Sequence, residues 1–221
     1  MVGLVVGTLS AGVAALLGGS AGLSPFVVAV IAVAVPPVVT GFFHEDAWAD
    51  VCDAFGAMTP IRRREIMRDS RVGSFGAAGV TLLIVIKVAG LAALPWRVVA
   101  PVVIGAHVIS RWSSVVMIAL SKYVDDPESL TKPYAGQVTF ERLLIATSVP
   151  TVPLAWWIFG PGVAAGLLIA TVGIVAVASR FFARWLGGIT GDCLGAVNQL
   201  VEAVVYLVAG QPTVVALIRH V

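Results

Sequence analysis

Three aspartates at helical spacing are the residues of this 221-residue chain that most strongly suggest chemistry. Asp46, Asp50 and Asp53 lie at positions i, i+4 and i+7, so a helix continuing from the apolar segment before them would stack their carboxylates on one face. Like charges so placed repel one another unless a cation lies between them, and Mg²⁺ commonly binds carboxylates together with substrate phosphates. The spacing indicates a divalent-metal site, although a solvated acidic helix end also fits it.

A basic segment follows, where polar sequence leads into apolar sequence. Three consecutive arginines precede Arg68, Asp69 and Arg71, and a glycine pair follows at Gly73 and Gly76. A positively charged flank at a membrane surface accounts for the first three arginines. The glycines instead allow close approach of a ligand to the backbone, where N–H groups can hold phosphate oxygens.

Isolated polar residues interrupt the later apolar stretches. Arg111, next to Ser110, is expected to face the protein interior and meet an acidic group or a phosphate, because an unpaired arginine is costly in a membrane. Glu202 needs a partner for the same reason. His107 fits a hydrogen-bonded core residue better than a ligand.

A glycine-rich segment, 187–196, opens the last apolar stretch and contains Thr190, Gly191 and Asp192. A glycine-rich loop leading into a helix can cradle an anion. Glycine also serves helix packing in membranes, so this segment alone is not specific.

Composition identifies the class of protein that must position these residues. The chain is 59% hydrophobic and 12% charged, with a mean hydropathy of +1.00, whereas an average soluble domain carries about 25% charged residues. The net charge of +2 gives no reason to expect nucleic-acid binding. Cys52 and Cys193 alone build neither a disulfide framework nor a zinc pattern. We therefore predict a polytopic membrane protein.

The charge-free stretches predict an all-α, polytopic integral membrane helical bundle of about seven transmembrane helices. Their ranges are near 2–18, 26–43, 75–94, 98–120, 143–159, 163–183 and 193–209. A kink is expected in the second at Pro36–Pro37. A signal peptide is the competing reading of the first, and the absence of a basic residue there counts against it.

The distribution of Lys and Arg predicts the orientation. One side of the expected bundle collects ten of the 14 basic residues and the other collects two, with two more inside spans. The richer side is expected to be cytoplasmic. It holds the polar segments 44–74, 107–142 and 184–192, which makes a cytosol-facing site plausible.

Four motifs, in order, resemble those of the cobalamin synthase family, the adenosylcobinamide-GDP ribazoletransferases. Residues 40–50, TGFFHEDAWAD, resemble the family's TGxxHEDGLAD, and residues 65–76, EIMRDSRVGSFG, are similar to EIMKDSRIGTFG. Residues 110–111 and 188–196, GITGDCLGA, match SR and GxTGDxLGA. Ala47 and Ala54 stand where the family usually has glycine. The chain, read as a single membrane-embedded domain over 1–221, is expected to lack the N-terminal segment that precedes the first span in the family.

The resemblance implies a Mg²⁺-dependent transfer at the cytoplasmic face of the cell inner membrane. A ribose hydroxyl of α-ribazole, or of α-ribazole 5′-phosphate, attacks the cobinamide-side phosphorus of adenosylcobinamide-GDP, and GMP leaves. Phosphoryl transfer depends mostly on positioning and charge neutralisation. Membrane lipid is the expected surrounding, a homo-oligomer is possible, and nucleic acid is not an expected partner.

The same resemblance implies roles for individual residues. The carboxylates expected to hold Mg²⁺ are Asp46, Asp50 and Asp53, and Asp192 would complete the phosphate cradle or a second metal site. Asp46 and Asp50 are thereby counted as catalytic, and His44 or Asp69 would accept the hydroxyl proton. The residues expected to bind substrate phosphates are Arg68, Arg71, Ser110, Arg111, Thr190 and Gly191.

Two other classes of protein remain as alternatives. CDP-alcohol phosphotransferases also place spaced aspartates at a membrane face, but their Asp-x-x-Asp-Gly start and Ala-Arg pair are missing here. A non-enzymatic transporter would place polar groups near the bilayer midplane and often shows paired repeats. The main acidic cluster here is expected at one face instead.

Overall fold

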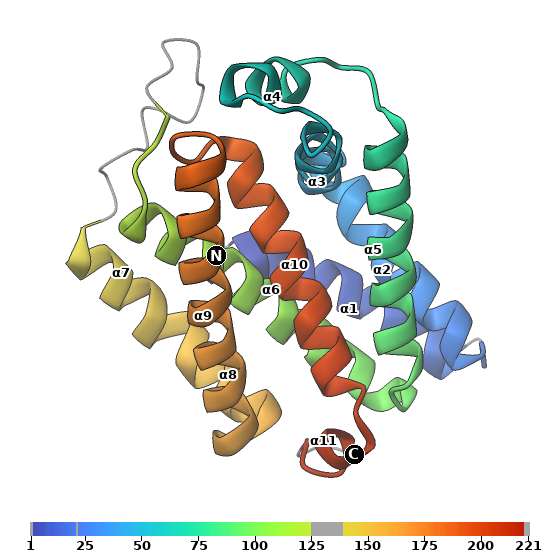
Figure 1. The fold of residues 1–221 in the computed structure, drawn as a ribbon. Coiled ribbons are helices and arrows are strands. Elements are labelled where there is room, and N and C mark those ends of the chain that lie inside the picture. The colour runs from blue at the N-terminus through green and yellow to red at the C-terminus, as the bar shows by residue number, and fades with distance from the viewer. Residues whose placement is uncertain (1, 21, 125–138, 219–221) are drawn as a thin grey trace.

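The protein is an almost entirely helical bundle. A computed structural model describes residues 2–20, 22–124 and 139–218. The helices, in chain order, are α1 (Val2–Ser20), α2 (Pro25–Thr40), α3 (Phe43–Ala54), α4 (Pro60–Met67), α5 (Ser74–Ala92), α6 (Trp96–Leu120), α7 (Phe140–Ala146), the π-helix η2 (Thr147–Thr151), α8 (Val152–Phe159), α9 (Pro161–Trp185), α10 (Gly191–Ala209) and α11 (Pro212–Val215) (Figure 1). The all-α prediction is confirmed.

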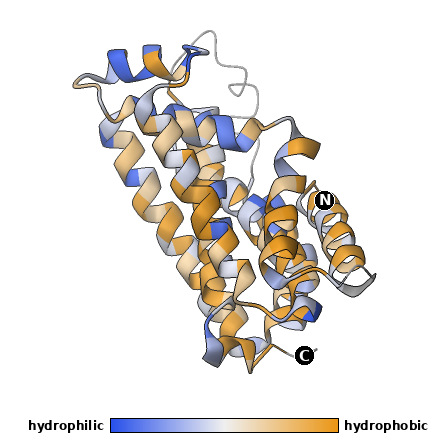
Figure 2. Cartoon of the chain, turned by 90° about the vertical axis from the view of Figure 1, so that its right-hand side faces the viewer, coloured by the Kyte–Doolittle hydropathy of each residue, from blue (hydrophilic) through white to orange (hydrophobic). Residues whose placement is uncertain are grey.

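Within the described ranges, five helical segments are long and apolar enough to cross a membrane. They are α5, α6, the run Glu141–Phe159, α9 and α10, and the count rises to six if α2 and α3 together form one bent span. The first expected span is helical and apolar but counts only as a shorter apolar helix. Figure 2 shows long helices coloured mainly as hydrophobic, with the hydrophilic α4 at one end. The prediction of a polytopic membrane bundle is confirmed, whereas a count of seven full spans is not reached.

The second expected span ends earlier than the sequence suggested. α2 continues through both prolines to Thr40, and α3 then leaves it at an angle of 93°. Gly41 and Phe42 cause this turn, because both adopt left-handed backbone conformations, with φ of 66° and 60°. The aspartates therefore lie on a separate helix, and the expectation of a continuous helix from α2 is wrong.

A hydrogen bond from α1 compensates for the proline inside α2. Pro36 has no N–H to offer the carbonyl of Ala32, four residues earlier. The Ser10 hydroxyl donates to that carbonyl oxygen at 2.8 Å. The contact joins α1 to α2 and keeps a buried polar group satisfied.

Helix α3 lies across one end of the bundle. In Figure 1 it is seen nearly end-on, while α5, α9 and α10 run from the top to the bottom of the picture. It carries four acidic residues in 12 positions, and the polar helix α4 follows it at the same end. We place α3 outside the membrane-spanning segments, at the polar face of the protein.

Candidate active site at the polar end of the bundle

Four carboxylates form an acidic cluster where α3 meets α10: Asp46, Asp50, Asp53 and Asp192. The two helices approach closely because Gly195 has no side chain; a Cβ there would lie 2.5 Å from the Cβ of Ala47. Burial raises the pKa of Asp50 to about 7, and repulsion from the other three carboxylates adds to this shift. The structure therefore brings together the four residues that the sequence nominated as metal ligands.

Asp53 has a structural task within the acidic cluster. Its two carboxylate oxygens accept backbone N–H groups of Gly73 and Gly76, each at 2.7 Å, at the beginning of α5. A Cβ at either glycine would lie 2.5 Å or less from an Asp53 oxygen, so both positions require glycine for this contact. The glycine pair holds a protein carboxylate here, where the sequence had suggested a ligand.

The acidic cluster fits a shared metal site rather than a closed cage. Within the described ranges, no three His, Cys, Asp or Glu side chains are arranged as a ready metal cage. Mg²⁺ is usually held by one or two carboxylates together with substrate phosphates. The donors are all oxygens, and their mutual repulsion, seen at Asp50, favours a cation. The residues present therefore fit Mg²⁺ shared with a phosphate-bearing substrate.

The beginning of α10 is fixed by Thr190. Its hydroxyl accepts the N–H of Cys193 at 3.4 Å and donates to the carboxylate of Asp192 at 3.3 Å. Gly191 is the first residue of the helix. The positive end of the α10 dipole thus points toward the acidic cluster and any anion bound there.

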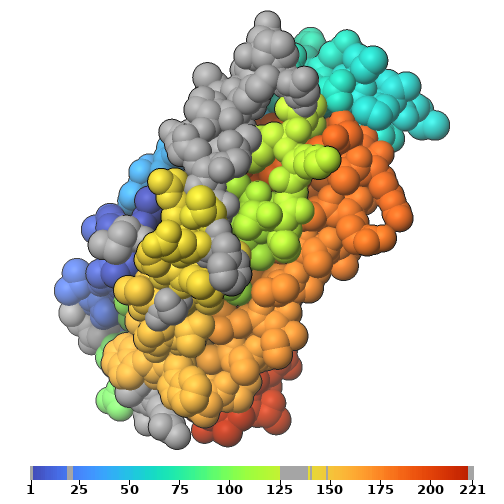
Figure 3. All heavy atoms as spheres, turned by 90° about the vertical axis from the view of Figure 1, so that its left-hand side faces the viewer, coloured from blue at the N-terminus to red at the C-terminus, as the bar shows by residue number. Residues whose placement is uncertain are grey.

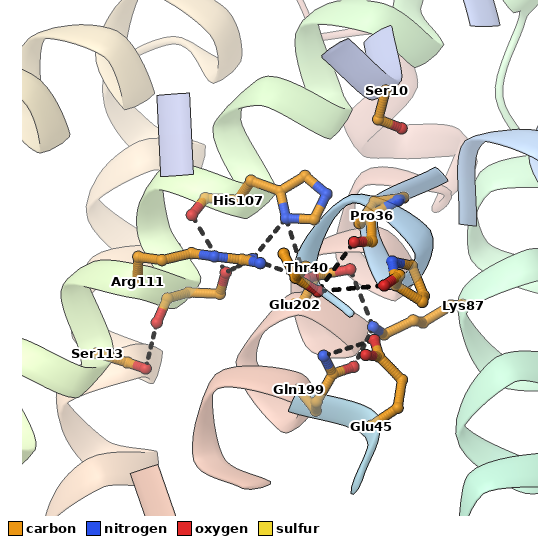
Figure 4. A network of polar contacts seen from close by, with 12 residues as sticks. Ser10, Pro36, Thr40, Glu45, Lys87, His107, Arg111, Ser113, Gln199 and Glu202 are labelled. Carbon is orange, nitrogen blue, oxygen red and sulfur yellow. Dashed lines mark hydrogen bonds and ion pairs between the residues drawn. The ribbon is translucent and has the colours of Figure 1, made fainter. Parts of the chain in front are cut away.

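A second group of charges is buried between the helices below α3. Glu202 on α10 pairs with Lys87 on α5 at 2.9 Å, with Arg111 on α6 at 3.0 Å and with the ring nitrogen of His107 at 3.2 Å (Figure 4). The expectation that Arg111 faces the interior and meets an acidic group is confirmed. Glu202 also has the partners that its position in a membrane requires.

This buried network extends up to α3. The Lys87 ammonium also donates to the Gln199 side-chain oxygen, and the Gln199 amide donates to Glu45 at 3.0 Å. Sequence reasoning did not assign Lys87, Gln199 or Glu45 to the site region. The position of Lys87 inside an expected span could have indicated this pairing. A basic residue and an acidic residue that both lie inside spans, such as Lys87 and Glu202, must find partners.

The remaining predicted site residues differ in their surroundings. Ser110 is fully buried, donates to the carbonyl of His107 at 3.2 Å and accepts from Arg111 at 3.0 Å. Asp69 and Arg71 pair with each other at 2.5 Å on an exposed loop, and Arg68 ends α4 with an exposed side chain. In the part of the chain that the structure describes, none of the hydrogen bonds or ion pairs of Ser110, Asp69 and Arg71 reaches the acidic cluster.

The two candidate proton acceptors are both unprotonated at neutral pH, but their surroundings differ. The Arg71 guanidinium lowers the pKa of Asp69 to about 2, so this carboxylate is a weak base at neutral pH. Burial lowers the pKa of His44 to about 4, which leaves its imidazole neutral. The Nδ1 atom of His44 is buried without a hydrogen-bond partner. His44 lies on α3, the helix that carries Asp46, Asp50 and Asp53, whereas Asp69 lies on the loop after α4.

Comparisons with known proteins agree with this arrangement. The family model described as cobalamin-5-phosphate synthase matches residues 1–210. Proteins named adenosylcobinamide-GDP ribazoletransferase include one from Shewanella baltica, 38% identical over 94% of this chain and 80% of the relative, and one from Vibrio cholerae, 35% identical over 94% and 79%. For a relative from Ralstonia pickettii the identity is 37%, over 76% of this chain and 66% of that protein. No solved structure matches. The chain belongs to the cobalamin-5-phosphate synthase family of membrane-embedded transferases.

Proposed function

We propose that this protein joins adenosylcobinamide-GDP to α-ribazole, or to α-ribazole 5′-phosphate, with release of GMP. A ribose hydroxyl oxygen forms a bond to the cobinamide-side phosphorus, and the bond from that phosphorus to the bridging oxygen breaks. GMP leaves with the electron pair of that bond, and the hydroxyl proton passes to a protein base. The names of the relatives supply the substrates, and the acidic cluster is the observation that supports this chemistry.

The acidic cluster would hold Mg²⁺ through Asp46, Asp50 and Asp192, with Asp53 contributing the oxygen lone pairs that its contacts to α5 leave open. Bound there, Mg²⁺ would neutralise charge on the pyrophosphate. The protein's own groups then orient the reactants: the N-terminus of α10 faces the anion, and the exposed side chains of Arg68 and Arg71 lie at the polar face. Arg71 would exchange its contact with Asp69 for one with phosphate.

His44 is the residue that we assign to proton transfer. It is neutral at pH 7, half buried, and part of the same helix as the acidic cluster. A general base must be unprotonated at the working pH and within reach of the proton that it accepts. Arg111 donates to Glu202 and to Ser110 inside the bundle, and Ser110 donates to the carbonyl of His107, so we assign both residues a positioning role rather than substrate contact.

The site would open to the cytoplasm, since the polar end that carries α3 and α4 also carries most of the basic residues. In a bacterial cell this corresponds to a multi-pass protein of the inner membrane. The membership in a family of transferases decides against the non-enzymatic transporter.

A single assay tests the proposal. Purified protein in liposomes is given adenosylcobinamide-GDP, with and without α-ribazole 5′-phosphate, and with Mg²⁺ or EDTA, and GMP is measured. We expect release only when both substrates and Mg²⁺ are present. Asp46→Asn should lower the rate by roughly 10²–10³-fold, because a lost charge-stabilising contact of this kind is worth several kcal/mol.

Membrane insertion and the melting temperature of the Asp46→Asn variant serve as controls, and both should match the wild type. Wild-type-like turnover in this variant would remove Asp46 from the metal site. GMP release that is independent of α-ribazole 5′-phosphate would contradict the transfer reaction itself.

A further inference from the structure

An apolar groove lies along α9, on the side where this helix faces α3 and α10. It has a volume of about 610 Å³, and its lining includes Trp48, Phe55, Gly173, Val177 and Leu200. Many of the α9 residues around it are exposed and apolar, which is the expected state of a surface in contact with lipid. The groove belongs neither to the acidic cluster nor to the buried network.

Three arginines surround a second hollow at the polar end of this groove. The hollow has a volume of about 560 Å³ and shares Val177 and Phe181 with the groove; its basic residues are Arg63, Arg180 and Arg184. In Figure 3 the helix α4, in cyan, lies beside the C-terminal end of α9, in orange, at this end of the molecule. None of the three arginines forms an ion pair with an acidic side chain in the described part of the chain.

Arg63 is held rigidly in that hollow. Its guanidinium donates to the carbonyl oxygens of Ala57 at 2.9 Å and Trp185 at 2.8 Å, and it lies 5.0 Å from the centre of the Trp185 ring. These contacts fix the position of the charge without neutralising it. A fixed, uncompensated guanidinium is well suited to an anionic oxygen.

We propose that the groove and the three arginines together bind one anionic phospholipid. Its phosphate would lie among Arg63, Arg180 and Arg184, and an acyl chain would fill the groove between α9 and α3. Charge complementarity supports this occupant. The basic residues lie at the polar end of an otherwise apolar groove, and an anionic lipid likewise has a charged head group at one end and apolar acyl chains at the other. A free phosphate would satisfy the arginines and leave the groove unused.

The lipid would contact the helix that carries the acidic cluster. Trp48 and Cys52 line the groove from α3, while Asp46 and Asp50 belong to the same 12-residue helix. An acyl chain in the groove would therefore support α3 from the side of the membrane. Binding should stabilise the folded protein, as any ligand specific to the native state does.

The test uses the purified, delipidated protein in a mild detergent. Phosphatidylglycerol and phosphatidylcholine are titrated separately, with bound lipid measured by native mass spectrometry and stability by melting temperature. We expect phosphatidylglycerol to bind more tightly and to raise the melting temperature more. The double variant Arg180→Gln/Arg184→Gln should lose roughly thirtyfold in apparent affinity for phosphatidylglycerol and little for phosphatidylcholine.

Arg97 provides a control for simple charge loss. It lies over the Trp96 ring at 5.5 Å, at the beginning of α6, and takes no part in the groove. Arg97→Gln should leave the lipid preference unchanged. Equal loss of phosphatidylglycerol binding in Arg97→Gln and in the double variant would overturn the proposal, because it would indicate non-specific attraction to the membrane charge.

A matched pair of glycine variants tests the acyl-chain part of the site. A Cβ at Gly173 would meet no heavy atom within 4 Å, so Gly173→Leu starts its side chain in the open space of the groove. Gly166, seven residues earlier on α9, has an equally open Cβ position but lies outside the groove. Gly173→Leu should weaken binding of both lipids, and Gly166→Leu should not. Unchanged phosphatidylglycerol binding in Gly173→Leu, or displacement of the lipid by inorganic phosphate alone, would contradict the proposal.

Discussion

Helices α3 and α10 contribute to two groups of charged side chains, and the two groups differ in how their charge is balanced. The buried network contains two carboxylates, Glu45 and Glu202, and two cations, Lys87 and Arg111. Each of these side chains has a hydrogen-bond partner within the network. In the acidic cluster, by contrast, every charged neighbour that shifts the pKa of Asp50 is itself acidic.

This difference indicates that the buried network is a structural scaffold and that the acidic cluster is a binding site. Buried charges are retained when they are paired, and a balanced network holds helices α5, α6 and α10 in a fixed relation without needing a ligand. Four carboxylates that face one another lower their energy by taking up a proton, as the raised pKa of Asp50 shows, or by binding a cation from outside. We therefore expect damage to the buried network to reduce stability first, and damage to the acidic cluster to reduce turnover first.

The largest expected effect is on stability, from Glu202→Gln. This change leaves the Lys87 and Arg111 cations buried with only one carboxylate, Glu45, between them. Removing one partner of a buried ion pair costs about 3–5 kcal/mol, which corresponds to a fall in melting temperature of roughly 10 °C. Thermal unfolding in detergent, followed by circular dichroism, measures it.

A compensating variant sharpens this prediction. The double change Lys87→Met/Glu202→Gln removes one charge of each sign and leaves Arg111 and Glu45, so it should recover a large part of the lost stability. Additive losses from the two single changes would show that charge balance is not what holds the buried network together.

The second effect is on turnover, from Asp50→Asn. Neutralising this side chain removes one of four repelling charges, so the melting temperature should stay the same or rise slightly. GMP release should fall by about 10²–10³-fold, because the amide is a weak ligand for a hard cation and carries no charge. A matched loss of turnover and stability would mean that Asp50 is part of the scaffold instead.

Local features of the site were predictable from the sequence. The spacing of Asp46, Asp50 and Asp53 fixes their placement on one helix, since it depends only on helical periodicity. The need for a partner at Arg111 and at Glu202 followed from the cost of a lone charge in a membrane. Both inferences use a residue and its immediate surroundings, and the structure agrees with both.

Features that depend on distant parts of the chain were not predictable. Lys87 and Glu202 are 115 residues apart, and the sequence shows that each needs a partner without showing which one. The turn between α2 and α3 requires a left-handed conformation at Phe42, a residue type that rarely adopts it. The contact of Asp53 with Gly73 and Gly76 likewise depends on how α3 packs on α5.

The smallest effect tests that last contact, which links the acidic cluster to the scaffold. In Gly76→Ala the added Cβ would lie 2.3 Å from an Asp53 oxygen and displace the carboxylate from the beginning of α5. Two charge-assisted hydrogen bonds would weaken, and we expect a loss of about 1–3 kcal/mol in stability and a modest, roughly tenfold, loss of GMP release.

Gly56→Ala is the matched control for Gly76→Ala, because its nearest neighbours lie 3.7 Å and 3.9 Å from the added Cβ, at ordinary contact distance. Gly56→Ala should change neither the stability nor the rate of GMP release. If Gly76→Ala loses stability but keeps full turnover, Asp53 serves the scaffold alone and the metal site consists of the other three carboxylates. If turnover falls with stability, Asp53 belongs to both groups, and the position of α5 then helps to set the geometry of the acidic cluster.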